Sequence, residues 1–188
     1  MRPADAALQL SMVLATMVLF MASVALNEWL FRWLEFVPGI NAVYLPAGVR
    51  LLCTLLFAEA GAIGLLLVSW YVGFAIFFPG QFERPFMGGL IAAAAPYLVY
   101  RGARHFYGLE AGLRNLTPRR LLVLILAYSV ANPLLHHLYF AIHGGDDLLR
   151  GFLVMFVGDL TGTVIVVYAL KGLLALAPRR PGLSPPAD

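Results

Sequence analysis

The chain has 188 residues, of which 61% are hydrophobic and only 12% charged, and its mean hydropathy is +0.84. Soluble domains carry about 25% charged residues, and a chain of 20.5 kDa has too little interior to bury this much apolar surface. These values exclude a soluble domain and predict an all-α, polytopic membrane protein. The net charge of +3 does not indicate a nucleic-acid partner, because the basic residues cluster at predicted helix ends.

The first predicted helix covers residues 8–26 and is retained rather than cleaved, because no clear signal-peptidase site follows it. Residues 27–36 mix tryptophan with charge, which predicts an extension of that helix along the membrane surface. Pro38-Gly39 ends this extension. The next apolar segment, residues 45–58, contains Arg50 and is about fourteen residues long, which is marginal for a full crossing.

Four more helices are expected, at residues 62–78, 86–100, 118–142 and 150–171. Pro96 and Pro133 lie inside two of these helices, and we expect a kink at Pro96. The chain is therefore predicted to form one six-helix transmembrane domain over residues 1–177, followed by a disordered, proline-rich cytoplasmic tail at 178–188.

The distribution of basic residues predicts the orientation. With six crossings and a cytoplasmic N-terminus, the cytoplasmic loops contain Arg101, Arg104, Arg114, Arg119, Arg120, Lys171, Arg179 and Arg180. The opposite side contains only Arg32, Arg84 and Arg150, set among acidic residues. Because cytoplasmic loops are enriched in lysine and arginine, both termini are expected in the cytoplasm, and the segment at 45–58 is expected to cross fully. The predicted location is the bacterial inner membrane, with the lipid bilayer as a partner.

Asp159 lies near the midpoint of the last predicted helix, in an otherwise apolar stretch. A carboxylate at that depth costs about 2.5–3.5 kcal/mol on insertion scales, so it is expected to face protein or water rather than lipid. Gly158 and Gly162 stand four residues apart, a spacing that allows another helix to approach closely.

Arg50 and Asp159 are natural partners, since a buried guanidinium needs an acceptor and a buried carboxylate needs donors. One interpretation is a polar cavity, open to the outer side, that binds an unknown small molecule. The other is a structural ion pair that fixes helix register. A third option has Arg50 extending to the surface, with Asp159 hydrogen-bonded to Thr161 or Asn132. The candidate ligand-binding residues are Arg50, Asn132, His136, His137, Asp159 and Thr161.

A metal site is not expected. His136 and His143 are seven residues apart, about 10 Å along a helix, which is too far for one ion. The chain also lacks a zinc-protease motif, a nucleophile elbow and a phosphate-binding loop, so we expect neither an enzyme nor a cofactor.

Three short motifs carry a resemblance: Leu45-Pro46-Ala47-Gly48, Gly61-Ala62-Ile63-Gly64 and Gly158-Asp159-Leu160-Thr161-Gly162. This pattern resembles the MASE1 family of bacterial integral membrane sensor domains. The resemblance implies a sensory role, and it implies that Asp159 and the segment 46–50 are the functional sites of this chain. Such domains are usually joined to a histidine kinase or a diguanylate cyclase, whereas this chain is expected to stand alone and to pair with another membrane protein.

A second resemblance points to transport. A six-helix chain of this size is similar to the substrate-capture subunit of energy-coupling-factor transporters, which binds a small molecule near the outer surface. That alternative implies a membrane coupling subunit and ATPases as partners.

Overall fold

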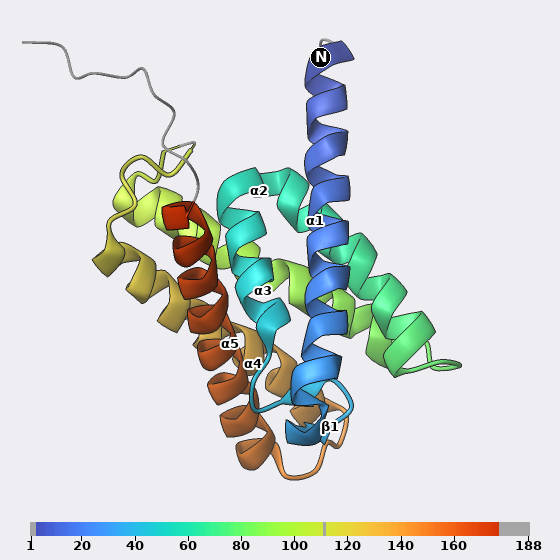
Figure 1. Cartoon of the computed structure of the whole chain (residues 1–188). Coiled ribbons are helices and arrows are strands. Elements are labelled where there is room, and N and C mark those ends of the chain that lie inside the picture. The colour runs from blue at the N-terminus through green and yellow to red at the C-terminus, as the bar shows by residue number, and fades with distance from the viewer. Residues whose placement is uncertain (1–2, 111, 177–188) are drawn as a thin grey trace, which may run out of the picture.

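The computed structural model describes residues 3–110 and 112–176, so the tail predicted at 178–188 lies outside the described residues. Helix α1 runs from Pro3 to Phe31 (Figure 1). One side of α1 is buried at helical spacing, at Thr16, Phe20, Ser23, Val24 and Asn27. Leucine and valine residues on its other sides are exposed, as expected for surfaces that contact lipid.

Helix α1 ends at Phe31, so the helical extension predicted for residues 27–36 is wrong in its second half. A single 3₁₀ turn covers Arg32–Leu34 and is followed by two short antiparallel strands, β1 (Glu35–Val37) and β2 (Ile40–Asn41). The strands reverse the chain at Gly39, whose φ of 86° is readily adopted only by glycine. This reversal directs the chain back toward the bundle.

Residues 41–45, the connecting segment, lie across the face of helix α5 (Leu148–Leu176). The Tyr44 amide donates a hydrogen bond to the Gly158 carbonyl at 3.1 Å, and the Thr161 hydroxyl donates to the Ala42 carbonyl at 3.2 Å. The Leu45 amide donates to the Asn27 side chain at 2.8 Å. Non-helical backbone inside a membrane must find partners within the protein, and these bonds supply them.

Glycine on α5 makes this contact possible. A side chain at Gly158 would collide with the Asn41 carbonyl, and one at Gly162 would collide with the Tyr44 carbonyl. The prediction of a close approach at these glycines is confirmed, but the neighbour is extended backbone and not another helix.

Helix α2 (Leu45–Val72) changes direction at Ala58, whose φ of 51° and ψ of −122° are not helical. Gly61 packs directly on the carbonyl group of Cys53, which an uninterrupted helix would hold about 12 Å away along its axis. The two arms of α2 therefore fold back sharply on each other, as Figure 1 shows. A π-helical turn, η2 (Gly73–Phe77), follows the second arm. Helix α2 is central, since it packs against α1, α3 and α5.

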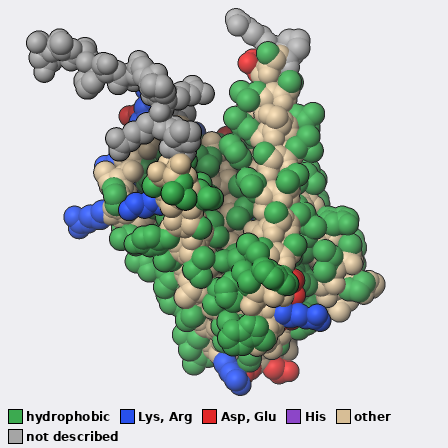
Figure 2. Space-filling view, in the orientation of Figure 1, with side chains coloured by type: hydrophobic (Ala, Val, Ile, Leu, Met, Phe, Trp, Pro, Cys, Tyr) green, Lys and Arg blue, Asp and Glu red, His purple; other side chains and the backbone are tan. Residues whose placement is uncertain are grey.

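Helices α3 (Glu83–Tyr107), α4 (Pro118–Ile142) and α5 complete the fold. The described residues thus form five α-helices rather than the six predicted, because the segment expected at 45–58 and most of the one expected at 62–78 belong to α2. Of these, α1, α2, α4 and α5 are long and apolar enough to cross a membrane. On the face in Figure 2, hydrophobic side chains cover the middle of the molecule and charged ones lie toward its ends. These features indicate a helical, multi-pass membrane protein.

The contact between α5 and the connecting segment can be tested by substitution. We expect Gly162→Ala to lower the free energy of unfolding by about 1–3 kcal/mol, because the new methyl group would overlap the Tyr44 carbonyl. Gly172→Ala is the matched control on the same helix, since a methyl group there would meet no atom within 4 Å. Thermal unfolding in detergent measures both, and an equal Tm for the two variants would contradict the contact.

Candidate functional site

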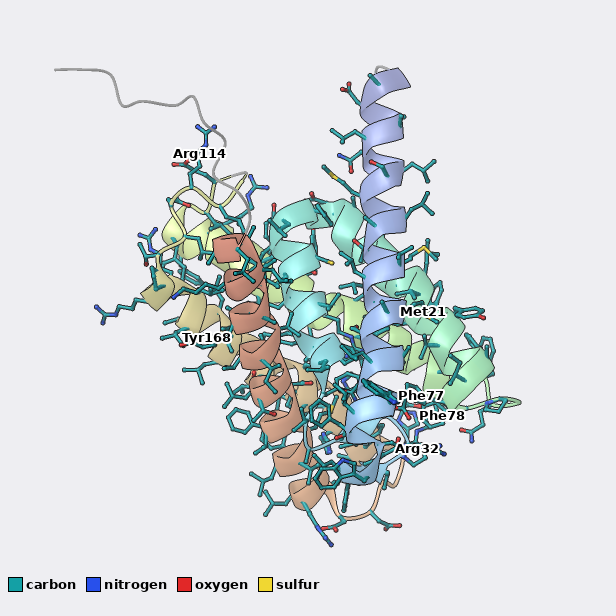
Figure 3. All side chains as sticks on the ribbon, in the orientation of Figure 1. Met21, Arg32, Phe77, Phe78, Arg114 and Tyr168 are labelled. Carbon is teal, nitrogen blue, oxygen red and sulfur yellow. The ribbon has the colours of Figure 1, made fainter. Side chains whose placement is uncertain are left out.

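A cavity of about 90 Å³, the central cavity, lies among α1, the β1–β2 hairpin, α2, α3 and α4. Its polar lining consists of Tyr44, Arg50, Ser69, Arg84 and His136. Aromatic side chains, among them Phe20, Phe77, Phe78 and Phe140, supply much of the remaining wall. In Figure 3, Phe77 and Phe78 lie beside the end of α1 that is distant from the N-terminus.

Arg50 is the most deeply placed charge in this cavity. The residue is only 7% exposed, so its guanidinium does not reach the surface. Its Cζ atom lies 5.1 Å from the centre of the Phe20 ring and 5.4 Å from that of Tyr44. It forms no ion pair with any described carboxylate, and its Nε atom has no hydrogen-bond partner. Two aromatic faces therefore stabilise the cation, but its hydrogen-bonding capacity is not used up by the protein.

Asp159 is bound by Asn132, one of the two alternative partners named from the sequence, and not by Arg50. Asn132 Nδ2 donates a hydrogen bond to Asp159 Oδ2 at 2.7 Å, and both residues are essentially fully buried. The ion pair expected between Arg50 and Asp159 is not formed, and the alternative partner, Asn132, takes its place. Asp159 Oδ1 has no partner among the described residues, and Asp159 does not line the central cavity. The two charged side chains do not touch, but they interact electrostatically, and the buried Tyr128 side chain interacts with both of them.

The two adjacent histidines, His136 and His137, line different cavities. His136 lines the central cavity, and its Nδ1 atom lies 3.0 Å from the Asn132 carbonyl oxygen. His137 packs against Gly151 and lines a second cavity of about 490 Å³, which also contains Arg84 and His143. His143 instead pairs with Glu83 at 2.9 Å. No cluster of three or more metal-ligating side chains occurs among residues 3–110 and 112–176.

Thr161 has a structural contact rather than a place in a cavity. Its hydroxyl donates to the carbonyl groups of Val157 at 2.7 Å and Ala42 at 3.2 Å, so it fastens the connecting segment to α5. Of the six candidate residues, only Arg50 and His136 therefore line the central cavity.

Two cavity residues were missed by the sequence analysis. Ser69 is the one hydroxyl group inside the apolar run at 62–70, which was a usable signal, and its buried Oγ atom has no hydrogen-bond partner. Arg84 was counted only as a loop charge. In the structure its Cζ atom lies 4.2 Å from the centre of the Phe78 ring, at a position where it lines both cavities.

The site is therefore a small, buried space whose charged lining residues are two arginines. Such a space can bind a polar molecule and orient it. Together with the fold, it defines a multi-pass membrane protein with an arginine-lined cavity inside a helical bundle. No protein-family model, curated protein or solved structure matches this chain.

The Asn132–Asp159 hydrogen bond predicts strong coupling between the two side chains. We expect Asn132→Leu to lower the free energy of unfolding by about 1–3 kcal/mol or more, because it leaves a buried carboxyl group without its donor. Asp159→Leu should also destabilise the bundle, and the double variant should cost less than the sum of the two. Thermal unfolding of the native chain, the two single variants and the double variant measures the coupling. Additive losses of unfolding free energy would show that the two side chains are not coupled.

Proposed function

We propose that this chain is a sensor-like module of the bacterial inner membrane that binds a small molecule in its central cavity without catalysis. One observation carries the proposal: Arg50 lines that cavity, is 93% buried and has no carboxylate partner among the described residues. A buried cation without a carboxylate in direct contact is costly, so its presence beside a cavity favours a ligand that supplies the missing contact.

We further propose six membrane crossings with both termini in the cytoplasm. The apolar stretch Leu45–Phe77 has 33 residues, about 50 Å of helix, whereas a hydrocarbon core is about 30 Å thick. Its reversal at Ala58 divides it into two arms, and each crosses once in this proposal: the second arm alone, and the first arm, about 20 Å long, together with the connecting segment before it. Arg32 and Arg114 lie at opposite ends of the bundle (Figure 3), and the greater number of arginines lies at the Arg114 end. The positive-inside rule then makes the cavity face the outer side.

This topology is open to a labelling test. The native thiol, Cys53, is buried, so single cysteines can be added to the chain with little background. Gln81→Cys should react with a membrane-impermeant maleimide in intact cells, whereas Arg114→Cys should react only after permeabilisation. Both positions are exposed. Equal labelling of both in intact cells would contradict the proposed crossing of α3.

The resemblance to MASE1-type sensors gives the proposal its role in signalling, with another membrane protein receiving the signal. The alternative is the capture subunit of an energy-coupling-factor-like transporter. The two differ in their partners, since transport requires a coupling subunit and ATPases to co-purify with the chain.

Binding is tested by the molecules that the purified protein releases. The full chain, purified in detergent and then denatured, should release a small molecule detectable by mass spectrometry. Arg50→Gln should lose it because the cavity loses its deepest charge, while the matched control Arg114→Gln, an exposed arginine at the other end, should retain it. Asp159→Asn should also retain it, since Asp159 lies outside the cavity lining. Identical release from Arg50→Gln and the native chain would refute the proposed site.

A further inference from the structure

We infer that the ligand of the central cavity is a small, free anion, a carboxylate or a comparable planar oxoanion. This inference rests on the proposed function and names its ligand class. The charged side chains in the cavity lining are Arg50 and Arg84, and no acidic side chain lines it among the described residues. A cationic ligand would meet two like charges there, and a neutral ligand would leave Arg50 without a carboxylate in direct contact.

The surroundings of Arg50 favour a planar partner. The rings of Phe20 and Tyr44 lie within 5.1 and 5.4 Å of its Cζ atom. Aromatic rings that stack on a guanidinium leave the donors at its edge available, and Nε is one such donor without a partner. The edge of a guanidinium matches the two oxygens of a carboxylate or a similar oxoanion, which accept two parallel hydrogen bonds.

Ser69 supplies a second donor on the other arm of α2. Its Oγ atom is buried, has no hydrogen-bond partner, and belongs to the lining of the same cavity as Arg50. A ligand oxygen can accept from this hydroxyl group while the remaining charge lies at Arg50. The cavity thus offers anion-binding donors from two parts of the chain.

The volume of the cavity limits the ligand to a few atoms. A cavity of about 150 Å³ is known to hold one benzene molecule, which has six heavy atoms. On that scale, a cavity of about 90 Å³ encloses roughly four heavy atoms. Acetate and nitrate have this size, lactate and pyruvate are slightly larger, and a lipid headgroup with its glycerol backbone is much larger.

Arg84 extends the positive charge from the central cavity into the second, larger cavity, since it lines both. Its Cζ atom lies 4.2 Å from the centre of the Phe78 ring and 5.8 Å from that of Phe140, two residues of the central cavity wall. A cation at the junction of two spaces raises the local concentration of anions and favours their entry.

The test uses the full chain in phosphatidylcholine nanodiscs, where no lipid carries net negative charge. Acetate, lactate, pyruvate and nitrate are each added, and the neutral amides acetamide and lactamide serve as matched probes of the same size. We expect at least one anion to raise Tm saturably, with an affinity at least tenfold above that of its amide. Arg50→Gln should lower that affinity at least tenfold.

A second variant keeps the test valid if Arg50→Gln folds poorly. Gly88 on α3 lines the central cavity, and a Cβ atom there would meet no atom within 4 Å, so we expect Gly88→Leu to reduce the cavity volume. We expect it to lower anion affinity at least tenfold. Gly102→Leu is the matched control, on the same helix with equally open space but outside the cavity lining, and should bind as the native chain does.

The outcomes separate this inference from the proposed function. If the amides bind as tightly as the anions and Gly88→Leu abolishes both, the cavity binds ligands but the anion inference is wrong. If a Tm shift appears only in discs that contain phosphatidylserine, the carboxylate belongs to lipid and the free-anion inference is wrong. If no anion binds, the inference also fails, while the molecule released by the purified protein still decides the proposed function.

Discussion

The contact between the connecting segment and α5 determines where the polar site lies. Residues 41–45 lie across the face of α5. Their amide and carbonyl groups form hydrogen bonds with α5 and with Asn27. Only glycine at 158 and 162 leaves space for them. Because this segment ends at Leu45, it fixes the start of α2 and, little more than one turn later, the position of Arg50. The position of Arg50 in the cavity therefore depends on the lack of side chains at Gly158 and Gly162 on α5.

Two buried polar groups lie close together in the bundle, and the structure gives them different partners. Asn132 satisfies one oxygen of Asp159, so this carboxylate is held by a neutral donor. Arg50 instead lies between two aromatic rings. Had the two charges paired with each other, neither would be available to a ligand. Because Asp159 is bound by Asn132, Arg50 has no carboxylate in direct contact among the described residues.

The sequence predicted the class of protein well because membrane insertion depends on long apolar segments, which composition reveals directly. It also predicted burial of Asp159 and the close approach at Gly158 and Gly162, because both follow from local chemistry. It did not predict what approaches these glycines. Small residues four apart accommodate a helix or an extended segment equally well, and only tertiary packing chooses between them.

The site was predicted in part for a similar reason. A buried arginine stands out in an apolar run, whereas Ser69 and Arg84 acquire a role only when α2 reverses and α3 packs beside it. The reversal itself is encoded weakly, since Ala58 adopts a φ of 51° that alanine rarely shows. Helix periodicity in the sequence does not reveal which separate segments come together in the folded chain.

The backbone break at Ala58 has a mechanical consequence. Arg50 belongs to the arm of α2 before the break and Ser69 to the arm after it, and both line one cavity. A hinge is a short stretch whose dihedral angles absorb the relative movement of two rigid bodies. A molecule that bridges Arg50 and Ser69 would hold the two arms at one angle, so occupancy of the cavity and the geometry of the turn at Ala58 would change together.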